Sequence, residues 1–320
     1  MTVSVIIPNY NGQHFLQKCI SSLLNVNFQT NEYEILMVDN DSSDSSVTYV
    51  QSTFPSVKVI LLDKNCGFGR SINIAARQAR GKYIALLNSD TEVEKNWLSS
   101  LVKTMNSDIG IGAVCSKAML GDENQIQNAG LVLFRQGFGR DRGALVDAER
   151  KMQSYEQDSA YFNDKREVWG FSGVSVLIRK DLFIELKGFD ELFFMYYEDA
   201  DFSIRLKKAG YRIVYDPNSV LHHIHTGSSD ETSLFFLYHS ERSRLVFLIK
   251  YYPFIVVIKE FLYFFFQMVF SFVRKRFGIA VKRMQILIWL MLHALLLIRA
   301  RVRERSYGKV EFLKLYQEMY

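Results

Sequence analysis

Short aliphatic runs that alternate with helix-patterned segments fill the first 90 residues, and this alternation restricts the fold more than any other feature of the sequence. Residues 3–8 and 34–39 are rich in Val, Ile and Leu, and each run ends in polar or turn-forming residues. Such runs are typical of strands that end in loops. Between them, apolar residues from Leu16 to Leu24 recur at helical spacing. The strand–helix–strand order predicts a parallel sheet built from βαβ units.

Two further strands are predicted at residues 57–62 and 83–87, with a helix between them. In open parallel sheets, ligands bind beyond the carboxyl ends of the strands. Polar residues follow three of the predicted strand ends, so Asn9, Asp39 and Asp90 are expected to meet in one crevice.

The second half of the chain continues this pattern after a break. Residues 135–158 are polar and weakly periodic, which predicts a mobile excursion over the crevice. A strand at residues 174–178 and a helix at 199–209, ended by Gly210, follow it. We therefore predict one α/β domain over residues 1–240.

The remaining residues, 241–320, differ in composition from this domain. From residue 245 onward there are 13 Lys and Arg against 4 Glu, a net charge of +9, which leaves −4 for the rest of a chain whose total is +5. The basic residues are mixed with Phe, Leu and Ile, and no nucleic-acid-reading motif accompanies them. This pattern favours an anionic membrane surface, and not nucleic acid, as the partner.

The longest uncharged stretches of this region, residues 261–273 and 284–298, are 13 and 15 residues long. A relaxed membrane-spanning helix needs roughly 20. We therefore predict helices that lie in the membrane interface or re-enter it. The alternatives are a hairpin through the bilayer, helices that pack on the first domain, and a homodimer interface. Because no basic leader precedes residues 3–8, the first domain is expected to stay in the cytoplasm.

Three groups of polar residues could carry chemistry. Asn88 and Asp90 offer hard oxygen ligands for Mg²⁺ or Mn²⁺, although the same stretch could simply cap a helix. Glu198 and Asp199 begin the predicted helix, where a carboxylate can accept a proton or merely favour the helix dipole. Residues 222–225 contain three histidines, which are candidate metal or phosphate ligands.

The glycines at residues 65–69 do not make a phosphate loop of a common type. The NCGFG turn lacks the GxGxxG spacing of a dinucleotide fingerprint, and no GxxxxGKS/T occurs in the chain. Rossmann dehydrogenases and P-loop enzymes are therefore excluded.

Taken in order, several segments resemble the family 2 glycosyltransferases, most closely their rhamnosyltransferase-like branch. These segments are SVIIPNYNG, ILMVDNDSSD, NCGFGRSINIAARQARGKYIALLNSDT, FSGVSVLIRKDLF and GFDELFFMYYEDADFSIRLKKAGYRIVYDP. The likeness covers about residues 3–230. It implies the GT-A fold: an α/β domain with a mixed, mainly parallel, nucleotide-binding sheet flanked by helices, followed here by the helical membrane-associating segment.

The resemblance also implies roles for individual residues. Asp199 corresponds to the catalytic base, with Glu198 beside it, and Asp90 to the metal ligand of a DxD-type element whose first Asp is Asn88 here. His223 corresponds to a further ligand of some relatives, although His222 or His225 could replace it. The nucleotide-binding residues implied are Pro8, Asn9, Tyr10, Asp39, Asn65 and Asn88, and those of the acceptor wall are Trp169, Ser172 and Gly173.

The activity implied is metal-dependent, inverting transfer of a sugar from a nucleotide-sugar donor to a saccharide in cell-surface polysaccharide synthesis. The branch favours dTDP-L-rhamnose, with UDP-hexose, UDP-GlcNAc and UDP-galactofuranose as alternatives. A polyprenyl-diphosphate-linked acceptor would explain the membrane-seeking end, and the enzyme would then be a peripheral or monotopic protein of the cytoplasmic face.

Two other classes of protein are less consistent with the sequence. A sugar-nucleotide pyrophosphorylase would carry a glycine-rich, basic signature after its first strand, and VSVIIPNYNG has none. A non-enzymatic membrane scaffold would not need Asp39, Asp90 and Asp199 together.

Overall fold

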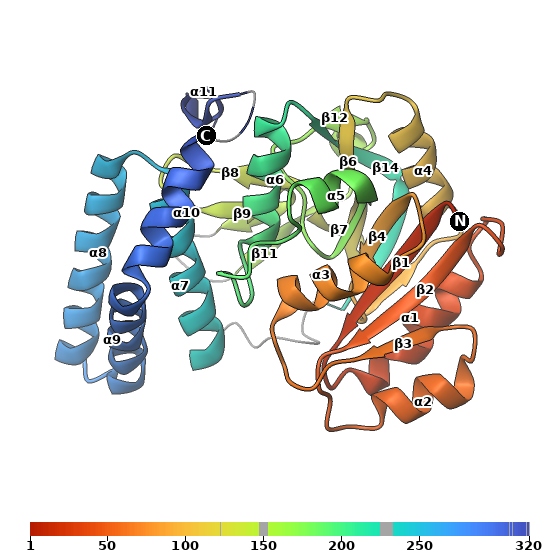
Figure 1. Cartoon of the computed structure of the whole chain (residues 1–320), viewed down its shortest axis with the longest axis horizontal. Helices are drawn as coiled ribbons and strands as arrows, with labels where there is room; N and C mark the ends of the chain where they lie inside the picture. The colour runs from red at the N-terminus through yellow and green to blue at the C-terminus, as the bar shows by residue number, and fades with distance from the viewer. Residues whose placement is uncertain are drawn as a thin grey trace.

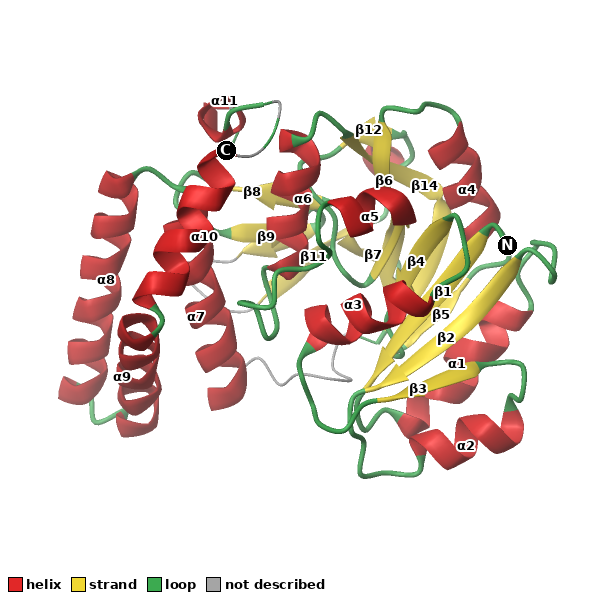
Figure 2. Cartoon of the chain, in the orientation of Figure 1, coloured by secondary structure: helices red, strands yellow, loops and turns green. Residues whose placement is uncertain are grey.

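The computed structural model describes residues 1–121, 123–146, 153–224, 233–306, 308, 310–317 and 319. Among these residues, twelve strands form one mixed sheet (Figures 1 and 2). Four parallel strands in the order β3-β2-β1-β4 make up its amino-terminal half. They are β1 (Val3–Asn9), β2 (Tyr33–Asp39), β3 (Lys58–Leu61) and β4 (Tyr83–Leu87). All four lie close to the ranges predicted from the sequence.

Helices cover both faces of this half of the sheet. The apolar side chains of α1, α2 and α4 join one core cluster with the inward residues of β1 and β2, whereas those of α3 and α5 join a second cluster on the opposite face. Because successive strand residues point to opposite faces, β1 supplies Val3, Val5 and Ile7 to the first cluster and Ile6 to the second. The helices are α1 (Gln13–Leu24), α2 (Ser46–Thr53), α3 (Phe68–Gln78), α4 (Trp97–Asn106) and α5 (Lys180–Glu185).

The sheet continues from β4 through strands of mixed direction. β13 (Ser175–Arg179) is antiparallel to β4, β6 (Ile111–Leu120) is antiparallel to β13, and the long β14 (Arg212–His223) is parallel to β6. The short β5 (Thr91–Val93) and β12 (Arg166–Glu167) pair with β14. The predicted α/β fold with a helix-flanked sheet is therefore confirmed.

Residues 135–158 contain strands where the sequence indicated an irregular excursion. The described part forms short antiparallel pairs that extend the sheet or lie beside it. Within this stretch lie β9 (Gly139–Asp141), β10 (Ala144–Val146) and β11 (Gln153–Gln157). Their neighbours β7 (Gln125–Asn128) and β8 (Leu131–Leu133) come before it, and the one-turn helix η1 (Ala160–Phe162) follows it. Runs of three to five residues are too short for a period-two pattern to stand out.

The carboxy-terminal helices lie at the side of the molecule opposite β3 and α2 (Figure 1), where the first of them packs on α6 (Glu198–Lys208) and the next three pack on the first. They are α7 (Leu234–Tyr251), α8 (Phe254–Val273), α9 (Phe277–Leu292), α10 (Ala294–Ser306) and α11 (Phe312–Gln317). The second half of α7 is buried against Ala200 and Ile204 of α6. The predicted boundary between residues 240 and 241 thus falls within α7, in a helix that belongs to the core.

By length and composition, α8 could cross a membrane, because it has 20 residues and its most apolar 18-residue stretch has a mean hydropathy of 1.7. α9 and α10, bent by 68° to each other, pass the same test only as a broken or re-entrant pair. The uncharged stretch at residues 261–273 is shorter than α8 because Lys259 and Glu260 lie within the helix. In the fold, Glu260 faces α7, where its carboxylate lies 2.9 Å from Nη1 of Arg244.

Candidate active site

The ends of β1 and β2 hold two of the predicted nucleotide-binding residues side by side. Asn9 and Asp39 are register partners, and Nδ2 of Asn9 donates to Oδ2 of Asp39 at 2.9 Å. Ser42 donates its backbone N–H to Oδ1 and its hydroxyl to Oδ2 of Asp39. Three of the roughly four lone-pair positions of this buried carboxylate are therefore used. Asp39 fixes the loop after β2 and keeps capacity for about one more donor.

The other residues of the predicted nucleotide set differ in exposure. Tyr10 is exposed and Pro8 is half-buried. Oδ1 of Asn65 accepts from Nδ2 of Asn40 and from the backbone N–H of Gly67. Asn40, which the sequence analysis missed, also accepts from the N–H of Cys66. The turn after β3 is thereby attached to the end of β2.

The loop after β4 contacts the loop after β1 across Gly12. A Cβ on Gly12 would lie 2.7 Å from Oδ1 of Asn9 and 3.3 Å from the hydroxyl of Ser89, so no side chain fits between the two loops. Oδ1 of Asn9 is buried and has no hydrogen-bond partner in the described part of the chain. Such an acceptor is available to a ligand donor. The backbone N–H of Asn88 donates to the carbonyl of Val174 at 3.0 Å, which places β13 beside the same loop.

Asp90 and His223, 133 residues apart, form a buried pair. Nε2 of His223 lies 3.0 Å from Oδ1 of Asp90, and its Nδ1 lies 2.6 Å from Oε1 of Gln127 on β7. With Gln127 in this orientation, Nδ1 carries the hydrogen, so Nε2 of a neutral imidazole presents a lone pair to the carboxylate. Two acceptors at this distance require a proton or a cation between them.

This pair fits a divalent cation. Adjacent ligands of an octahedral ion with bonds of about 2.1 Å lie about 3 Å apart, which matches the separation of the two side chains. Histidine ligands usually donate their second ring N–H to an oxygen acceptor, and Gln127 provides one. Within the described residues no cluster holds three or more His, Cys, Asp or Glu ligands, so a cation here would take its remaining ligands from substrate and water.

The structure distinguishes the neighbouring histidines of β14. Nδ1 of His222 lies 2.9 Å from the carbonyl of Gly121, and Nε2 lies 3.5 Å from Glu94. His222 therefore points to the face of the strand opposite His223. His225 lies outside the described residues.

Glu198 and Asp199 begin α6 at the carboxyl side of the same sheet. Oδ2 of Asp199 accepts from the backbone N–H of Gly173 at 3.1 Å, and Oδ1 accepts from the N–H of Ala200. Asp199 is half-buried, and burial raises its pKa despite these two hydrogen bonds. A partly accessible carboxylate of raised pKa is suited to general base catalysis.

Glu198 is more deeply buried than Asp199. Burial, with the charge of Asp199 adding to it, raises the pKa of Glu198 well above the usual glutamate value. Its Oε2 has no hydrogen-bond partner among the described residues. Since an uncompensated buried carboxylate is costly, the neutral form of Glu198 is favoured. Of the two adjacent carboxylates, Glu198 has the more strongly raised pKa, so Asp199 is the better candidate for the base.

The predicted acceptor-wall residues do not all lie together. Gly173 is next to Asp199, and a Cβ on it would meet the Phe68 ring at 3.0 Å. Ser172 is half-buried and accepts from the N–H of Val174. Trp169 instead lies under Lys207, whose Nζ is 5.7 Å from the ring centre. Eight helical residues separate Lys207 from Asp199, about 12 Å at 1.5 Å per residue, so an acceptor role for Trp169 would require a large acceptor.

A sequence model of glycosyl transferase family 2 matches residues 4–186. A curated relative, the N-acetylglucosaminyl-diphospho-decaprenol L-rhamnosyltransferase of Mycobacterium tuberculosis, is 27% identical over 236 residues. The match covers 67% of this chain and 74% of the relative.

Two solved structures share the fold at low sequence identity. GalNAc-T7 in complex with UDP, GalNAc and Mn²⁺ superposes with a TM-score of 0.61 at 17% identity, over 78% of this chain and 48% of the other. The mannosyltransferase PcManGT from Pyrobaculum calidifontis, in complex with GDP-Man and Mn²⁺, has a TM-score of 0.52 at 16% identity. That match covers 99% of this chain and 82% of the other, so the shared architecture extends over the carboxy-terminal helices.

Proposed function

The chain belongs to glycosyl transferase family 2, and on this basis we propose that it moves a sugar from a nucleotide-sugar donor to a hydroxyl of a lipid-linked saccharide, with inversion at the anomeric carbon. The observation that carries this proposal is the position of Asp199. Its half-buried carboxylate, with raised pKa, is connected through Gly173 and Val174 to the loop that bears Asn88 and Asp90.

The chemistry assigned to the chain's own residues is a single displacement. Asp199 takes the proton of the acceptor hydroxyl, whose oxygen forms a bond to the anomeric carbon. The bond from that carbon to the diphosphate breaks, and the nucleoside diphosphate leaves with the electron pair. Asn9, Asp39 and Asn65 hold the three loops against which the nucleotide would lie. Gly173 donates to Asp199 and so orients the base.

Asp90 and His223 would hold the divalent cation, either Mg²⁺ or Mn²⁺. When bound, the cation would neutralise the charge that develops on the departing diphosphate. Asn88 supplies an amide where related DxD elements have a carboxylate, which predicts weaker binding of the cation in the absence of nucleotide.

We propose dTDP-L-rhamnose as the donor, and the named activity of the mycobacterial relative supports this choice. The same relative acts on a decaprenyl-diphosphate-linked sugar, which supports a polyprenyl-diphosphate-linked acceptor here. UDP-linked hexoses, UDP-GlcNAc and UDP-galactofuranose are the alternative donors, because pocket shape sets donor choice.

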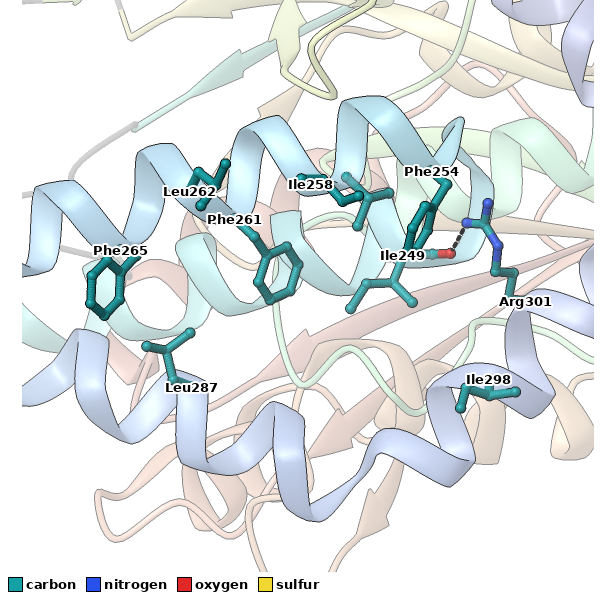
Figure 3. Close-up of a pocket in the computed structure, with 10 residues that line it drawn as sticks. Ile249, Phe254, Ile258, Phe261, Leu262, Phe265, Leu287, Ile298 and Arg301 are labelled. Atoms are coloured by element: carbon teal, nitrogen blue, oxygen red, sulfur yellow. Dashed lines mark hydrogen bonds between the residues drawn. The ribbon is translucent and has the colours of Figure 1, made fainter.

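We propose that the carboxy-terminal helices attach the protein to a membrane, at its cytoplasmic face. Apolar side chains of α8 are exposed along its length, among them Phe254, Phe266 and Phe270 at 69, 65 and 54%. A groove of about 520 Å³ lies among α7, α8, α9 and α10, with Phe261 and Phe265 pointing toward Leu287 (Figure 3). This surface is suited to the hydrocarbon of a lipid.

A donor screen tests the proposed reaction. The full-length protein in detergent would be mixed with a short-chain polyprenyl-diphosphate-linked disaccharide and each nucleotide sugar in turn, with and without EDTA. We expect nucleoside diphosphate release that depends on acceptor and metal, fastest with dTDP-L-rhamnose. NMR of the product should show the anomeric configuration opposite to that of the donor. Retained configuration would contradict the assigned mechanism, and faster release from a UDP-sugar would contradict the donor.

A further inference from the structure

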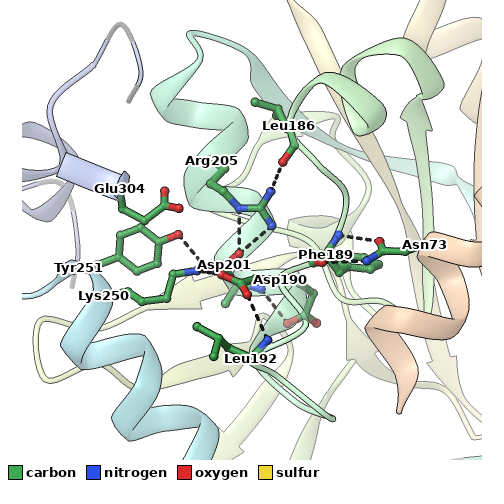
Figure 4. Close-up of polar contacts among 12 residues, drawn as sticks. Asn73, Leu186, Phe189, Asp190, Leu192, Asp201, Arg205, Lys250, Tyr251 and Glu304 are labelled. Carbon is green, nitrogen blue, oxygen red and sulfur yellow. Dashed lines mark hydrogen bonds and ion pairs between the residues drawn. The ribbon is translucent and has the colours of Figure 1, made fainter. Parts of the chain in front are cut away.

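A buried charge cluster connects α6 to the carboxy-terminal helices (Figure 4). Its centre is Asp201, whose side chain is fully buried two residues after the proposed base. Oδ2 of Asp201 accepts from Nε of Arg205 at 2.8 Å, and Oδ1 accepts from the hydroxyl of Tyr251 at 2.7 Å and from Nζ of Lys250. The carboxylate is therefore shared between its own helix and α7.

Lys250 contacts a second carboxylate as well. Its fully buried Nζ lies 2.6 Å from Oδ2 of Asp190, which also receives Nη2 of Arg303 on α10 at 2.8 Å. Burial opposes ionisation of Asp190, but the charge and hydrogen bond of Lys250 outweigh it and hold the pKa below its usual range. One ammonium group thus joins residues 190 and 201, the two ends of the segment that contains Glu198 and Asp199.

The segment between these ends has a backbone that needs external support. Tyr196 and Tyr197, directly before α6, have φ angles of 67° and 71°. For non-glycine residues this conformation is unfavourable and persists only where the surroundings fix it. The carbonyl of Phe194 accepts from the N–H of Phe68, and that of Met195 accepts from the hydroxyl of Ser243 on α7.

Buried ion pairs seldom add net stability compared with apolar residues of similar volume. Removing one member, however, leaves a carboxylate unpaired in the interior. The main effect of the cluster is therefore on geometry and not on stability. It fixes the start of α6 relative to the turn at residues 65–69 and to α7.

We propose that Lys250 is a positioning residue for the transferase reaction: by bridging Asp190 and Asp201 it holds the backbone that presents Asp199 to the acceptor. The carboxy-terminal helices are then part of the catalytic unit as well as a surface for a membrane. The inference rests on the proposed function for its kinetic consequence, but its structural consequence can be measured without any substrate.

Three variants of the full-length protein in detergent test the inference. Lys250→Met removes the bridge, and Asp190→Asn releases one end of it while leaving the contact between Lys250 and Asp201. The matched control is Arg283→Met, which removes a partly buried cation from the contact of α9 with Glu241 of α7 at 2.6 Å. Hydrogen–deuterium exchange would be followed in peptides covering residues 190–201 and, as an internal reference, residues 3–39.

We expect exchange at residues 190–201 to rise at least about tenfold in Lys250→Met and in Asp190→Asn but not in Arg283→Met, with the reference peptides unchanged. With an active donor, kcat should fall at least about tenfold while KM for the donor changes less than about threefold. If Lys250→Met does not fold, Asp190→Asn alone decides the outcome.

Two results would overturn the inference: wild-type exchange at residues 190–201 in every folded variant of the bridge, or an equal rise in the Arg283 control. Absence of sugar transfer by the wild-type protein would instead overturn the proposed function, and the exchange result would still stand.

Discussion

Asp199 differs from the other carboxylates of the site because it is partly accessible, has a raised pKa and lies beside Gly173. We expect Asp199→Asn to lower kcat at least about a hundredfold, the usual scale for loss of a general base, with little change in nucleotide affinity by calorimetry. In the wild type, activity should fall as the pH drops through the raised pKa of Asp199. The midpoint should therefore lie above about 3.9, the ordinary aspartate value. Near-normal turnover in the variant would place the base elsewhere.

We expect the buried carboxyl group of Glu198 to lower the free energy of unfolding at neutral pH. The unfolded chain ionises Glu198 at about pH 4.3, whereas the folded chain keeps the proton to a higher pH. Folded stability is then lost as the pH rises between these two values, and it stays lower above them. Glu198→Gln should therefore raise the Tm at pH 7.5 by at least about 2 °C, a shift that corresponds to roughly 1 kcal/mol.

The gain in Tm should vanish below about pH 4, where the unfolded chain is protonated as well. Scanning calorimetry across this range is the measurement. Glu185→Gln, on an exposed glutamate of α5, serves as the control. A lower Tm for Glu198→Gln at pH 7.5 would show that the carboxylate is compensated in the fold.

Gln127 should affect the affinity for the cation although it does not contact the ion. Gln127→Met keeps the volume but removes the acceptor that orients His223, and loss of such a partner typically weakens metal binding 10–100-fold. Titration of Mn²⁺ in the presence of nucleoside diphosphate, followed by electron paramagnetic resonance, would measure this effect. Gln125→Met, on the same strand, should bind Mn²⁺ like the wild type, and Asp90→Ala should not bind it at ordinary concentrations. Unchanged affinity for Mn²⁺ in Gln127→Met would argue that His223 is not a ligand of the cation.

The sequence indicated the acidic candidates of this site but not two of its buried amides. Asp39, Asp90 and Asp199 follow or begin predicted elements at one edge of a sheet, so topology alone predicts that they lie at the same edge. Asn40 and Gln127 gave no signal, because a single amide in a strand or loop looks like an ordinary surface residue. Only the pairing of distant segments shows that both are buried and bonded.

At the scale of elements, the sequence predicted helices and strands correctly where the apolar pattern was long enough to show a period. β1 to β4 and α6 were found because each combines an apolar run with a clear stop. β8, β9 and β10, of three residues each, were missed. Their extended conformation depends on pairing with neighbouring strands and not on the strand propensity of their own residues. The boundary at residue 240 was placed by composition, which cannot tell a core helix from a membrane-facing one.

The position of α7 gives a prediction about truncation. Leu245, Val246, Phe247 and Leu248 are completely buried, and burial of each such side chain contributes about 1.5–3 kcal/mol. Together this is roughly 6–12 kcal/mol, comparable to the whole stability of an ordinary domain. A chain that ends at residue 240 should therefore fail to unfold cooperatively, whereas one that ends at 252 should show a cooperative, lowered Tm. Equal unfolding curves would mean that α7 is dispensable.

The whole molecule has one acidic and one basic end. The acidic part bears the sheet and the site, and the net charge of +9 lies on the carboxy-terminal residues. The exposed aromatic residues of α8 end next to Arg274, Lys275 and Arg276, which are also exposed. Apolar side chains that border a cationic turn match the layering of an anionic membrane surface, with hydrocarbon inside and phosphate at the boundary.

We therefore expect the full-length protein to bind liposomes that contain phosphatidylglycerol. Replacing Arg274, Lys275 and Arg276 by Gln should weaken binding on the order of a hundredfold, because each basic residue near such a surface contributes about 1 kcal/mol. Phe266→Ser with Phe270→Ser should weaken binding independently of salt. Leu61→Ser with Ile109→Ser, at positions on the sheet domain that are also more than half exposed, should not. Flotation at two salt concentrations measures all three variants. A protein that ignores the liposomes and sediments as a dimer without detergent would assign the apolar face of α8 to a second copy of the chain instead.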